Sequence, residues 1–600
     1  MKEKAMTYKN PLPFSDGKEH TNPDPYILRW CGDYYCYATD EKGVKVSVSK
    51  DLILWESRGY ALEDAAFHDY WAPSVWYENG VFYLYYSNVE EGEEDCHQEL
   101  LKLAVSRNPL GPFEYQKTFF EEFSIDSHPV FWNGQLSLLY SVNNWIGTEE
   151  KMAGTCILQD RMLRPDVMEG EPKAVLLPSL PQEIYEADRF GDGRDWYTIE
   201  GACILRHGRY CWLLYSANAY EHEDYFVGTA VAGNRKDFRD MDFRKYPSAD
   251  QWEPLLKKNA EAEGTGHNTV TKAPNMVDDW IVYHGRDARE ELILGKEQRT
   301  MRMDALYYDG RKLLCAGPSC GETKGPCGPQ QSLRNLTVTE SVEVKGAAFY
   351  HMELWISAVR QHTGARFGVF LAYLDEENHV ELQVSSGSRS FGIWQCRDGI
   401  RIRLGEGRLP AGFDYTSPHL ITAERREDHF LALLDEKEML DVRAEPMTGE
   451  GKVRIVPYFS QMKLHSLDLT EHAYLAGEDL IHLTSFYEVR QAYADETGLY
   501  HPYKETELLL KKGSRDGCWR DEFSLETEGT KNRLCIFQDE TCILERRLPA
   551  GETTMYLVKE EEREGIFQGG VFTDVEGLSG GKLRIVLNHV KLTEFYHTKI

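Results

Sequence analysis

The sequence predicts an all-β protein: a five-bladed β-propeller followed by two β-sandwich modules of jelly-roll or concanavalin-like type. Three observations predict it. Short aromatic-rich strands recur along the first half, turn residues separate alternating strands throughout, and helical periodicity is scarce. A chain of 600 residues has room for three domains. We expect the propeller at 1–328 and the sandwiches at 329–472 and 473–600.

The repeat that predicts the propeller is a turn glycine followed by an aromatic-rich strand ending in Tyr-Ser or a similar pair. It occurs at 32–38, 80–87, 134–141 and 208–216, and without the glycine at 279–284. The units are about 50–75 residues apart, which is close to one four-stranded blade each, with insertions. The alternative is an irregular β-sandwich with coincidental hairpins.

The second half of the chain has a different sequence pattern, in which stretches of alternating apolar and polar residues, typical of strands, lie between turn residues. A weaker duplication, in which 451–456 resembles 581–586 and 433–436 resembles 537–540, predicts two related sandwich modules. The segment 479–503 is ambiguous between a short helix and a long connection. We expect the sandwiches to have a mainly structural role or to complete the rim of the propeller's site. Polysaccharide binding by the sandwiches is the alternative.

Net charge and the pattern of apolar residues limit which partners and which cellular compartment we expect for this protein. The formal net charge of −30 predicts repulsion of nucleic acid and of anionic membranes, so we expect neither as a partner. No apolar run approaches the ~18 residues that a membrane span needs. The first residues lack a following apolar stretch, which predicts no secretion signal and a cytoplasmic location, with a trimmed signal as the alternative. The oligomeric state stays open.

Cysteine usage gives a second indication of the compartment. Thirteen cysteines, an odd number scattered through apolar runs, favour buried thiols in a reducing environment over a disulfide framework. Cys315, Cys320 and Cys327 cluster in a Gly/Pro-rich stretch whose spacing matches no pair of CxxC knuckles. We interpret that stretch as a linker rather than a zinc site.

Three carboxylates share one position in the repeat. Asp24, Asp126 and Glu200 each lie eight residues before the turn glycine of their unit, at the start of the strand that precedes the turn. That strand is the innermost of a propeller blade, so equivalent positions converge near the axis. Turn capping is the alternative for any one of them, but it does not explain three in register.

Converging carboxylates raise one another's pKa, so one can stay protonated near neutrality while another is ionised. Cleavage of a glycosidic bond needs such a pair: one group protonates the leaving oxygen, and the other activates water or attacks the anomeric carbon. This chemistry requires no cofactor. Trp71 lies beside the repeated position in the second unit and could stack on a sugar ring. Other tryptophans are interpreted as packing or as further sugar contacts: Trp76, Trp132, Trp145 and Trp196.

The surrounding motifs resemble a known family. The matching stretches are Asn22-Pro23-Asp24-Pro25-Tyr26, Trp71-Ala72-Pro73-Ser74-Val75, Ser124-Ile125-Asp126, Thr198-Ile199-Glu200-Gly201, Gly266-His267-Asn268, and 299–306 with Asp309-Gly310. In order and register they resemble glycoside hydrolase family 43, the five-bladed propeller enzymes that act on arabinose- and xylose-containing glycans. The resemblance covers about residues 18–315.

The resemblance implies roles for the candidate residues. Asp24 would be the general base, Glu200 the general acid, and Asp126 the residue that tunes the acid's pKa and orients the sugar. His267 resembles a histidine that contacts calcium or its water in several members, with a structural histidine as the alternative. Arg299 would bind substrate, with Arg286 and Arg302 as competitors.

Two departures from the family pattern concern substrate identity. Ser74 stands where an acidic residue usually follows Trp-Ala-Pro, and Ser127-His128 follows Asp126 where the family often has Pro. Because His128 lies two residues along a strand from Asp126, it is expected to share its face.

The implied activity is an inverting, exo-acting hydrolase that releases L-arabinofuranose or D-xylose from plant-type oligosaccharides or polysaccharides. Inversion requires about 6.5–9.5 Å between Asp24 and Glu200. The alternatives are a retaining β-fructosidase-like propeller, which the Asn-Pro-Asp-Pro context disfavours, a non-catalytic carbohydrate-binding propeller, and a protein-interaction propeller.

Overall fold

The computed structural model describes residues 6–93, 95, 98–143, 152–293, 295–360, 364–447, 449–458, 461–501, 505–511, 517–527, 532–561, 563–575, 578 and 583–600. Trp145 and Gly581-Lys582, which the sequence singled out, lie outside these residues. The described chain consists of strands with three short 3-10 helices, η3 (Pro181–Glu183), η4 (Phe238–Asp240) and η5 (Gly477–Ser485). Within it, no helix has the length and apolar character that a membrane crossing requires.

The first half forms five blade sheets, which are antiparallel except where β12 and β16 pair in parallel in the third blade. Blade one is β2 (Tyr26–Trp30), β3 (Asp33–Ala38), β4 (Gly43–Ser49) and β5 (Trp55–Glu63). Blade two is β6 (Phe67–Glu78), β7 (Val81–Glu90), β8 (Leu100–Ser106) and β9 (Glu114–Thr118). Blade three is β10 (Ser124–Trp132), β11 (Gln135–Asn143) and β12 (Ala153–Arg164), with the short strands β13 (Val167–Met168), β14 (Lys173–Leu176), β15 (Ile184–Glu186) and β16 (Trp196–Tyr197).

Blade four is β17 (Ile199–His207), β18 (Tyr210–Ala217), β19 (Phe226–Gly233) and β20 (Arg244–Lys245). Blade five is β23 (Ala262–Lys272), β24 (Asp279–Asp287), β25 (Thr300–Tyr308) and β26 (Leu313–Cys315). A small hairpin, β21 (Pro247–Ser248) and β22 (Gln251–Trp252), lies between them. Near the start of the chain, β1 (Thr7–Tyr8) pairs with β27 (Thr323–Lys324).

The blades close into a ring. The first strand of each blade contacts the first strands of its two neighbours, in the cycle β2, β6, β10, β17, β23 and back to β2. The apolar residues gather between blades: one core cluster fills the space between blades one and two, and similar clusters fill each of the other four gaps. Burial between twisted sheets stabilises a propeller because each blade covers one face of the next. The predicted fold class is confirmed.

The repeated turn glycines connect the first and second strands of blades one to four. In the first three blades the two turn residues both have positive φ, as in Asn79 (49°) and Gly80 (88°) between β6 and β7. A two-residue type I′ turn requires this conformation, and it matches the twist of the flanking strands. The glycine repeat in the sequence therefore marks a real hairpin, because the two-residue turns that join antiparallel strands need a residue with positive φ.

The first sandwich has two six-stranded sheets. One sheet has the order β28 (Gln331–Val338), β39 (Met462–Thr470), β30 (Phe349–Ala358), β35 (His419–Arg426), β36 (His429–Leu434) and β37 (Lys437–Arg443). The other has β29 (Val342–Lys345), β38 (Lys452–Pro457), β31 (Arg366–Tyr373), β32 (His379–Ser385), β33 (Ser390–Arg397) and β34 (Ile400–Arg408). One large apolar cluster fills the space between the sheets.

The second sandwich pairs an eight-stranded sheet with a five-stranded one. The larger sheet contains β42 (Tyr493–Asp495), β43 (Gly498–Tyr500), β52 (Val590–Lys599), β45 (Trp519–Thr527), β48 (Gly551–Lys559), β49 (Glu564–Gln568) and β50 (Val571–Asp574), and β40 (His472–Ala476) pairs with β52. The smaller contains β41 (Tyr487–Arg490), β44 (Thr506–Leu510), β51 (Leu583–Asn588), β46 (Arg533–Gln538) and β47 (Thr541–Arg546). The ambiguous segment 479–503 holds most of η5 and then three short strands.

The predicted duplication between the sandwiches is wrong. Its two landmarks in the first sandwich fall on β36 and β38, which belong to opposite sheets. The corresponding landmarks in the second sandwich fall on β46 and on the strand that begins at Leu583, β51, and these two are hydrogen-bonded neighbours. The sequence likeness reflects the common alternation of strand and turn, since topologically equivalent strands would occupy the same sheet in both modules.

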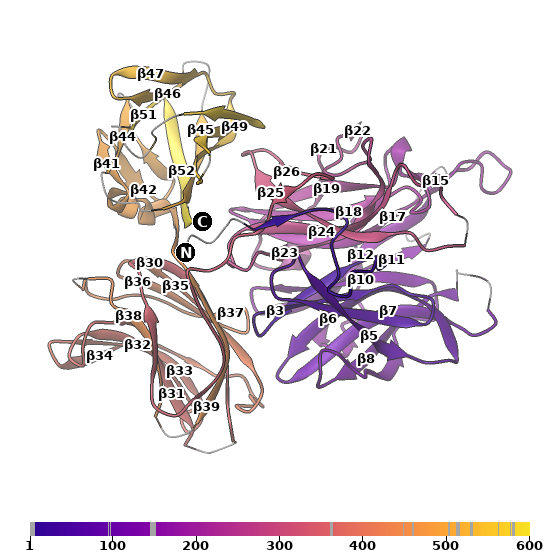
Figure 1. The fold of residues 1–600 in the computed structure, drawn as a ribbon, viewed down its shortest axis with the longest axis horizontal. Helices are drawn as coiled ribbons and strands as arrows, with labels where there is room; N and C mark the ends of the chain where they lie inside the picture. The colour runs from indigo at the N-terminus through magenta and orange to yellow at the C-terminus, as the bar shows by residue number, and fades with distance from the viewer. Residues whose placement is uncertain are drawn as a thin grey trace.

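Both sandwiches lie on the same side of the propeller (Figure 1). The first contacts the turn end of the blades: Tyr77 Oη donates to the Pro418 carbonyl (2.7 Å) and Asn79 Nδ2 to the Gly412 carbonyl (2.9 Å). The second also contacts turns, through the ion pair Arg520–Asp278 (2.6 Å) and a bond from the Thr554 N–H to the Asp309 carbonyl (2.8 Å). The contacts in this part of the structure thus gather at the end opposite the starts of the innermost strands, and the expected rim role is not supported.

Candidate active site

The starts of the innermost strands carry an unusual backbone. Positive φ recurs there at Asp24 (53°), Ala72 (35°), Asp126 (57°), Gly201 (60°) and His267 (43°). In blades two to five the strand pairing slips at the same place, which marks β-bulges. A bulge turns a side chain away from the normal alternation and often lies beside a functional site, where left-handed backbone is held by the surrounding structure. The polar residues are therefore aimed by the backbone toward the propeller axis.

Asp24 is held by hydrogen bonds and cations from several blades. Its Oδ2 accepts from Thr39 Oγ1 (2.6 Å), and its Oδ1 lies 3.3 Å from Arg299 Nη1 and 3.4 Å from His267 Nδ1. Nδ1 of the fully buried His284 is 3.1 Å from both Oδ1 and the backbone nitrogen of Asp24. Burial would raise the pKa of Asp24, but Arg299, His267 and His284 outweigh it and hold the pKa far below its usual value. Asp24 is an ionised carboxylate.

Asp126 and Glu200 behave in the opposite way. Burial, then the neighbouring Glu200 and Asp24, raise the pKa of Asp126 well above its ordinary value. Burial raises the pKa of Glu200 to about 7, with a hydrogen bond from Tyr225 Oη to Oε1 (2.7 Å) opposing the shift and Asp24 adding to it. The Gly201 N–H donates to Asp126 Oδ2 (3.2 Å). The pair therefore retains a proton at neutral pH, while Asp24 does not.

Asp126, Glu200 and His267 also form a compact group of possible metal ligands, whose donor atoms lie within 4.8 Å of one another. Calcium takes six to eight oxygen ligands. This group offers one ring nitrogen and two carboxyl groups that already accept hydrogen bonds and favour their protonated forms. The residues do not make a calcium cage by themselves. Among the described residues, the other such group is Cys535, Cys542 and Glu545, so Cys315, Cys320 and Cys327 form no metal cluster there.

Of the three candidate arginines, Arg299 is the one that faces the acids. It joins Asp24 to Glu297, and its guanidinium lies 4.4 Å from the centre of the Tyr220 ring. Arg286 instead donates to the carbonyls of Tyr220 (2.8 Å) and Glu221 (3.0 Å). Arg302 is 2% exposed. Arg286 thus supports the loop that carries Tyr220, while Arg299 contacts the ionised carboxylate directly.

The other candidate residues lie close to the bulges. Trp71 lies in β6 opposite Ser87, next to the left-handed Ala72, and is partly exposed. The two departures from the family pattern contact each other: Ser74 Oγ and Ser127 Oγ are 2.9 Å apart, and both residues are buried. A bulge separates Ile125 from His128, so simple alternation fails there. His128 lines a cavity of about 520 Å³ with Glu436 and Lys437 of the first sandwich.

The polar residues of the site that were not predicted from the sequence include His284 and Tyr225. His284 ends the aromatic-rich strand of the fifth repeat, where other repeats have serine (Ser87, Ser141, Ser216), and this substitution was an available signal. Tyr225 lies in the connection to β19, outside the repeat, and carries no periodic signal. Its ring stacks on His284 (5.7 Å, 4°). A Cβ at Gly266 would lie 2.1 Å from that ring, which explains a glycine before His267.

Comparison with known proteins gives one family match and several similar proteins. Residues 13–310 match the family described as "Glycosyl hydrolases family 43". The chain is 22% identical over 328 residues (51% of this chain, 62% of the relative) to the extracellular exo-α-(1→5)-L-arabinofuranosidase of Streptomyces avermitilis. It is 24% identical over 305 residues (48% and 59%) to α-L-arabinofuranosidase 43 of Humicola insolens. The chain thus spans about 60% of the length of these two relatives.

Three further similarities involve a shorter match or solved structures. A β-xylosidase of Bacillus subtilis is 33% identical over 95 residues, which is 13% of this chain and 18% of the relative. The crystal structure of a thermostable family-43 glycoside hydrolase covers 54% of this chain and 100% of its own, with 29% identity and a TM-score of 0.46. The α-L-arabinofuranosidase of Lactobacillus brevis covers 50% and 94%, with 20% identity and a TM-score of 0.42.

Proposed function

We propose that this chain, whose residues 13–310 belong to glycosyl hydrolases family 43, is an inverting, exo-acting glycoside hydrolase that releases L-arabinofuranose or D-xylose from plant-type glycans. One observation carries the proposal: carboxyl groups gathered at the axis have their pKa values driven apart, Asp24 downward and Glu200 to about 7. Such a separation assigns base and acid at one pH. The names of the relatives support pentose as the released sugar, and the name of the Streptomyces avermitilis relative supports exo action.

In the proposed reaction Glu200 gives its proton to the glycosidic oxygen as the bond between that oxygen and the anomeric carbon breaks. A water molecule attacks the anomeric carbon from the opposite face and loses a proton to Asp24. The transition state resembles an oxocarbenium ion, so deprotonation of water comes late and a weakly basic carboxylate suffices. Arg299 keeps Asp24 ionised, and burial together with the negative charge of Asp24 keeps a proton on Glu200. Asp126, whose own pKa is raised well above its ordinary value, orients the sugar beside Glu200 in its protonated form. No step uses a cofactor.

The test is hydrolysis of p-nitrophenyl α-L-arabinofuranoside, β-D-xyloside and β-fructoside, with NMR detection of the first-formed anomer. Release of pentose with inverted configuration is the expected result. Retention, with preference for the fructoside, would support the β-fructosidase alternative. Sugar binding without cleavage of any of the three would support a non-catalytic propeller.

A further inference from the structure

A large cavity lies where the propeller meets both sandwiches. Its volume is about 830 Å³, within the range of ligand sites. Its walls come from the blade turns around Asp278 and Tyr307, from β45 and β52 of the second sandwich, and from β35 and β36 of the first. Because these walls include the turn end of the blades, the cavity is separate from the carboxylates at the starts of the innermost strands.

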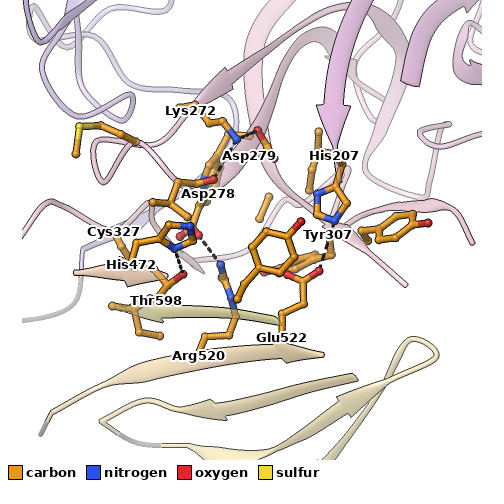
Figure 2. Close-up of a pocket in the computed structure, with 18 of the residues that line it drawn as sticks. His207, Lys272, Asp278, Asp279, Tyr307, Cys327, His472, Arg520, Glu522 and Thr598 are labelled. Carbon is orange, nitrogen blue, oxygen red and sulfur yellow. Dashed lines mark hydrogen bonds and ion pairs between the residues drawn. The ribbon is translucent and has the colours of Figure 1, made fainter. Parts of the chain in front are cut away.

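Several charged groups in the cavity wall are already paired across the domain boundary or within a turn. Arg520 binds Asp278 (2.6 Å), and Lys272 binds Asp279 (2.7 Å). Figure 2 shows both pairs facing the same space, with His207 opposite Glu522. A charged ligand would have to displace one of these partners. Hydroxyl groups, in contrast, can donate to the carboxylates and accept from the cations while the pairs remain.

An aromatic ring is available beside these pairs. Tyr307 lies between the propeller and the second sandwich, where surrounding protein raises its pKa to about 12, yet 37% of its surface remains accessible. Its ring centre is 6.0 Å from that of Phe567. Tyr474 and Tyr596 stack on each other (4.7 Å), so part of their surfaces is covered. An apolar ring face next to polar hydrogen-bonding groups suits a ligand that has both C–H faces and hydroxyls.

We propose that this cavity is a second binding site for a neutral oligosaccharide. A sugar ring packs against Tyr307, and its hydroxyls bond to the Arg520–Asp278 and Lys272–Asp279 pairs, so that the ligand bridges the propeller and the second sandwich. The neutral, hydroxyl-rich chemistry follows from the cavity wall. That the sugar is a pentose oligomer rests on the proposed function.

The test is calorimetric titration of the full chain carrying Glu200→Gln, so that the probes are not consumed, with arabinotriose and xylotriose as probes and cellotriose as a hexose comparison. We expect two binding events per chain with at least one pentose trimer. Adding Tyr307→Ala should weaken one of them at least tenfold and leave the other unchanged. The matched control is Tyr115→Ala on β9, which removes an aromatic ring that is 56% exposed outside both sites.

Two further measurements keep the test decisive. If Tyr307→Ala fails to fold, Val277→Trp adds bulk inside the same cavity and keeps Tyr307 and both charged pairs, and it should also abolish the second event. Hydrogen exchange should show sugar-induced protection in β25 and β45. A single binding event that survives Tyr307→Ala or Val277→Trp, or two events that both survive, would overturn the proposal. Wild-type hydrolysis is measured separately, so an inactive propeller with an intact second site, or the reverse, distinguishes the two proposals.

Discussion

The two ends of the innermost strands use positive φ in opposite ways. At the starting end, the left-handed residues include Asp24, Asp126 and His267, whose side chains would be easier to place in ordinary extended backbone. At the turn end, the left-handed residues include glycines such as Gly80, where this conformation costs little and the sandwiches pack closely. Strain with chemistry at one end and tight turns with docking at the other indicate that catalysis and assembly are separated along the strands.

The largest expected effect comes from the acids. Glu200→Gln and Asp24→Asn should each lower kcat/KM on a natural pentose oligomer by about 10²–10⁴-fold. A p-nitrophenolate leaving group needs little protonation, so Glu200→Gln should lose less on the aryl pentoside than on the oligomer. Asp24→Asn should lose about as much on both. Thermal unfolding of each variant controls for folding, and equal losses for both variants on both substrates would contradict the division of roles.

The pH dependence should sharpen the same comparison. Because the pKa of Glu200 is about 7, kcat/KM should fall about tenfold per pH unit above that value. Asp24 should add no acidic limb in the range where the protein is folded, since its pKa is held far below normal. Asp126→Asn should leave the alkaline limb near its wild-type position, because Asp126 favours its protonated form and the substitution then removes no charge. Tyr225→Phe should move the alkaline limb to higher pH. The hydrogen bond from Tyr225 stabilises the charged form of Glu200, so its removal raises the pKa of Glu200.

Stability gives an independent readout of the same group. The folded-state pKa of Glu200 lies above the unfolded value of 4.5. The contribution of Glu200 to the free energy of unfolding is therefore fully present below about pH 4.5 and is lost as the pH rises through about 7. Wild type should therefore lose thermal stability relative to Glu200→Gln between pH 5 and 8. A pH-independent difference in Tm would show that Glu200 does not titrate in this window.

A smaller effect is expected at the turn end. In Gly80→Ala the new Cβ would lie 2.2 Å from Ser417 Oγ of the first sandwich, in addition to the strain of φ at 88°. The matched control is Gly59→Ala, with φ at 83° but no atom within 4 Å of the new Cβ. Backbone strain should lower the free energy of unfolding of both variants by about 1–2 kcal/mol, and Gly80→Ala should lose more because of its contact with Ser417. Calorimetry checks the difference, and kcat should be unchanged. Equal losses would mean that docking tolerates the methyl group.

The smallest effect is expected from metal removal. Since Asp126, Glu200 and His267 alone do not complete a calcium site, dialysis against EDTA should change kcat/KM by less than about twofold. Readdition of Ca²⁺ after dialysis is the control. A large loss that Ca²⁺ restores would contradict this expectation and would favour the calcium alternative at His267.

The sequence by itself determined the local elements. Turn glycines and aromatic alternation specify hairpins because type I′ geometry and period-two burial are properties of a few neighbouring residues. Their repetition was enough to predict five blades and to put Asp24, Asp126 and Glu200 in one register. It was not enough to compare the sandwiches, where alternation recurs without shared topology, nor to foresee that bulges would break the alternation at His128.

Tertiary structure alone decided which groups face one another. Asp24 contacts Thr39, His284 and Arg299, which are separated from it by 15 to 275 positions in the chain. Closure of the ring of blades brings these residues together. The divergence of the carboxyl pKa values depends on those contacts and on burial. It is therefore a property of the closed ring and not of any motif. The same holds for the end of the propeller that the sandwiches cover and for the cavity between them, since both arise from surfaces that are distant in sequence.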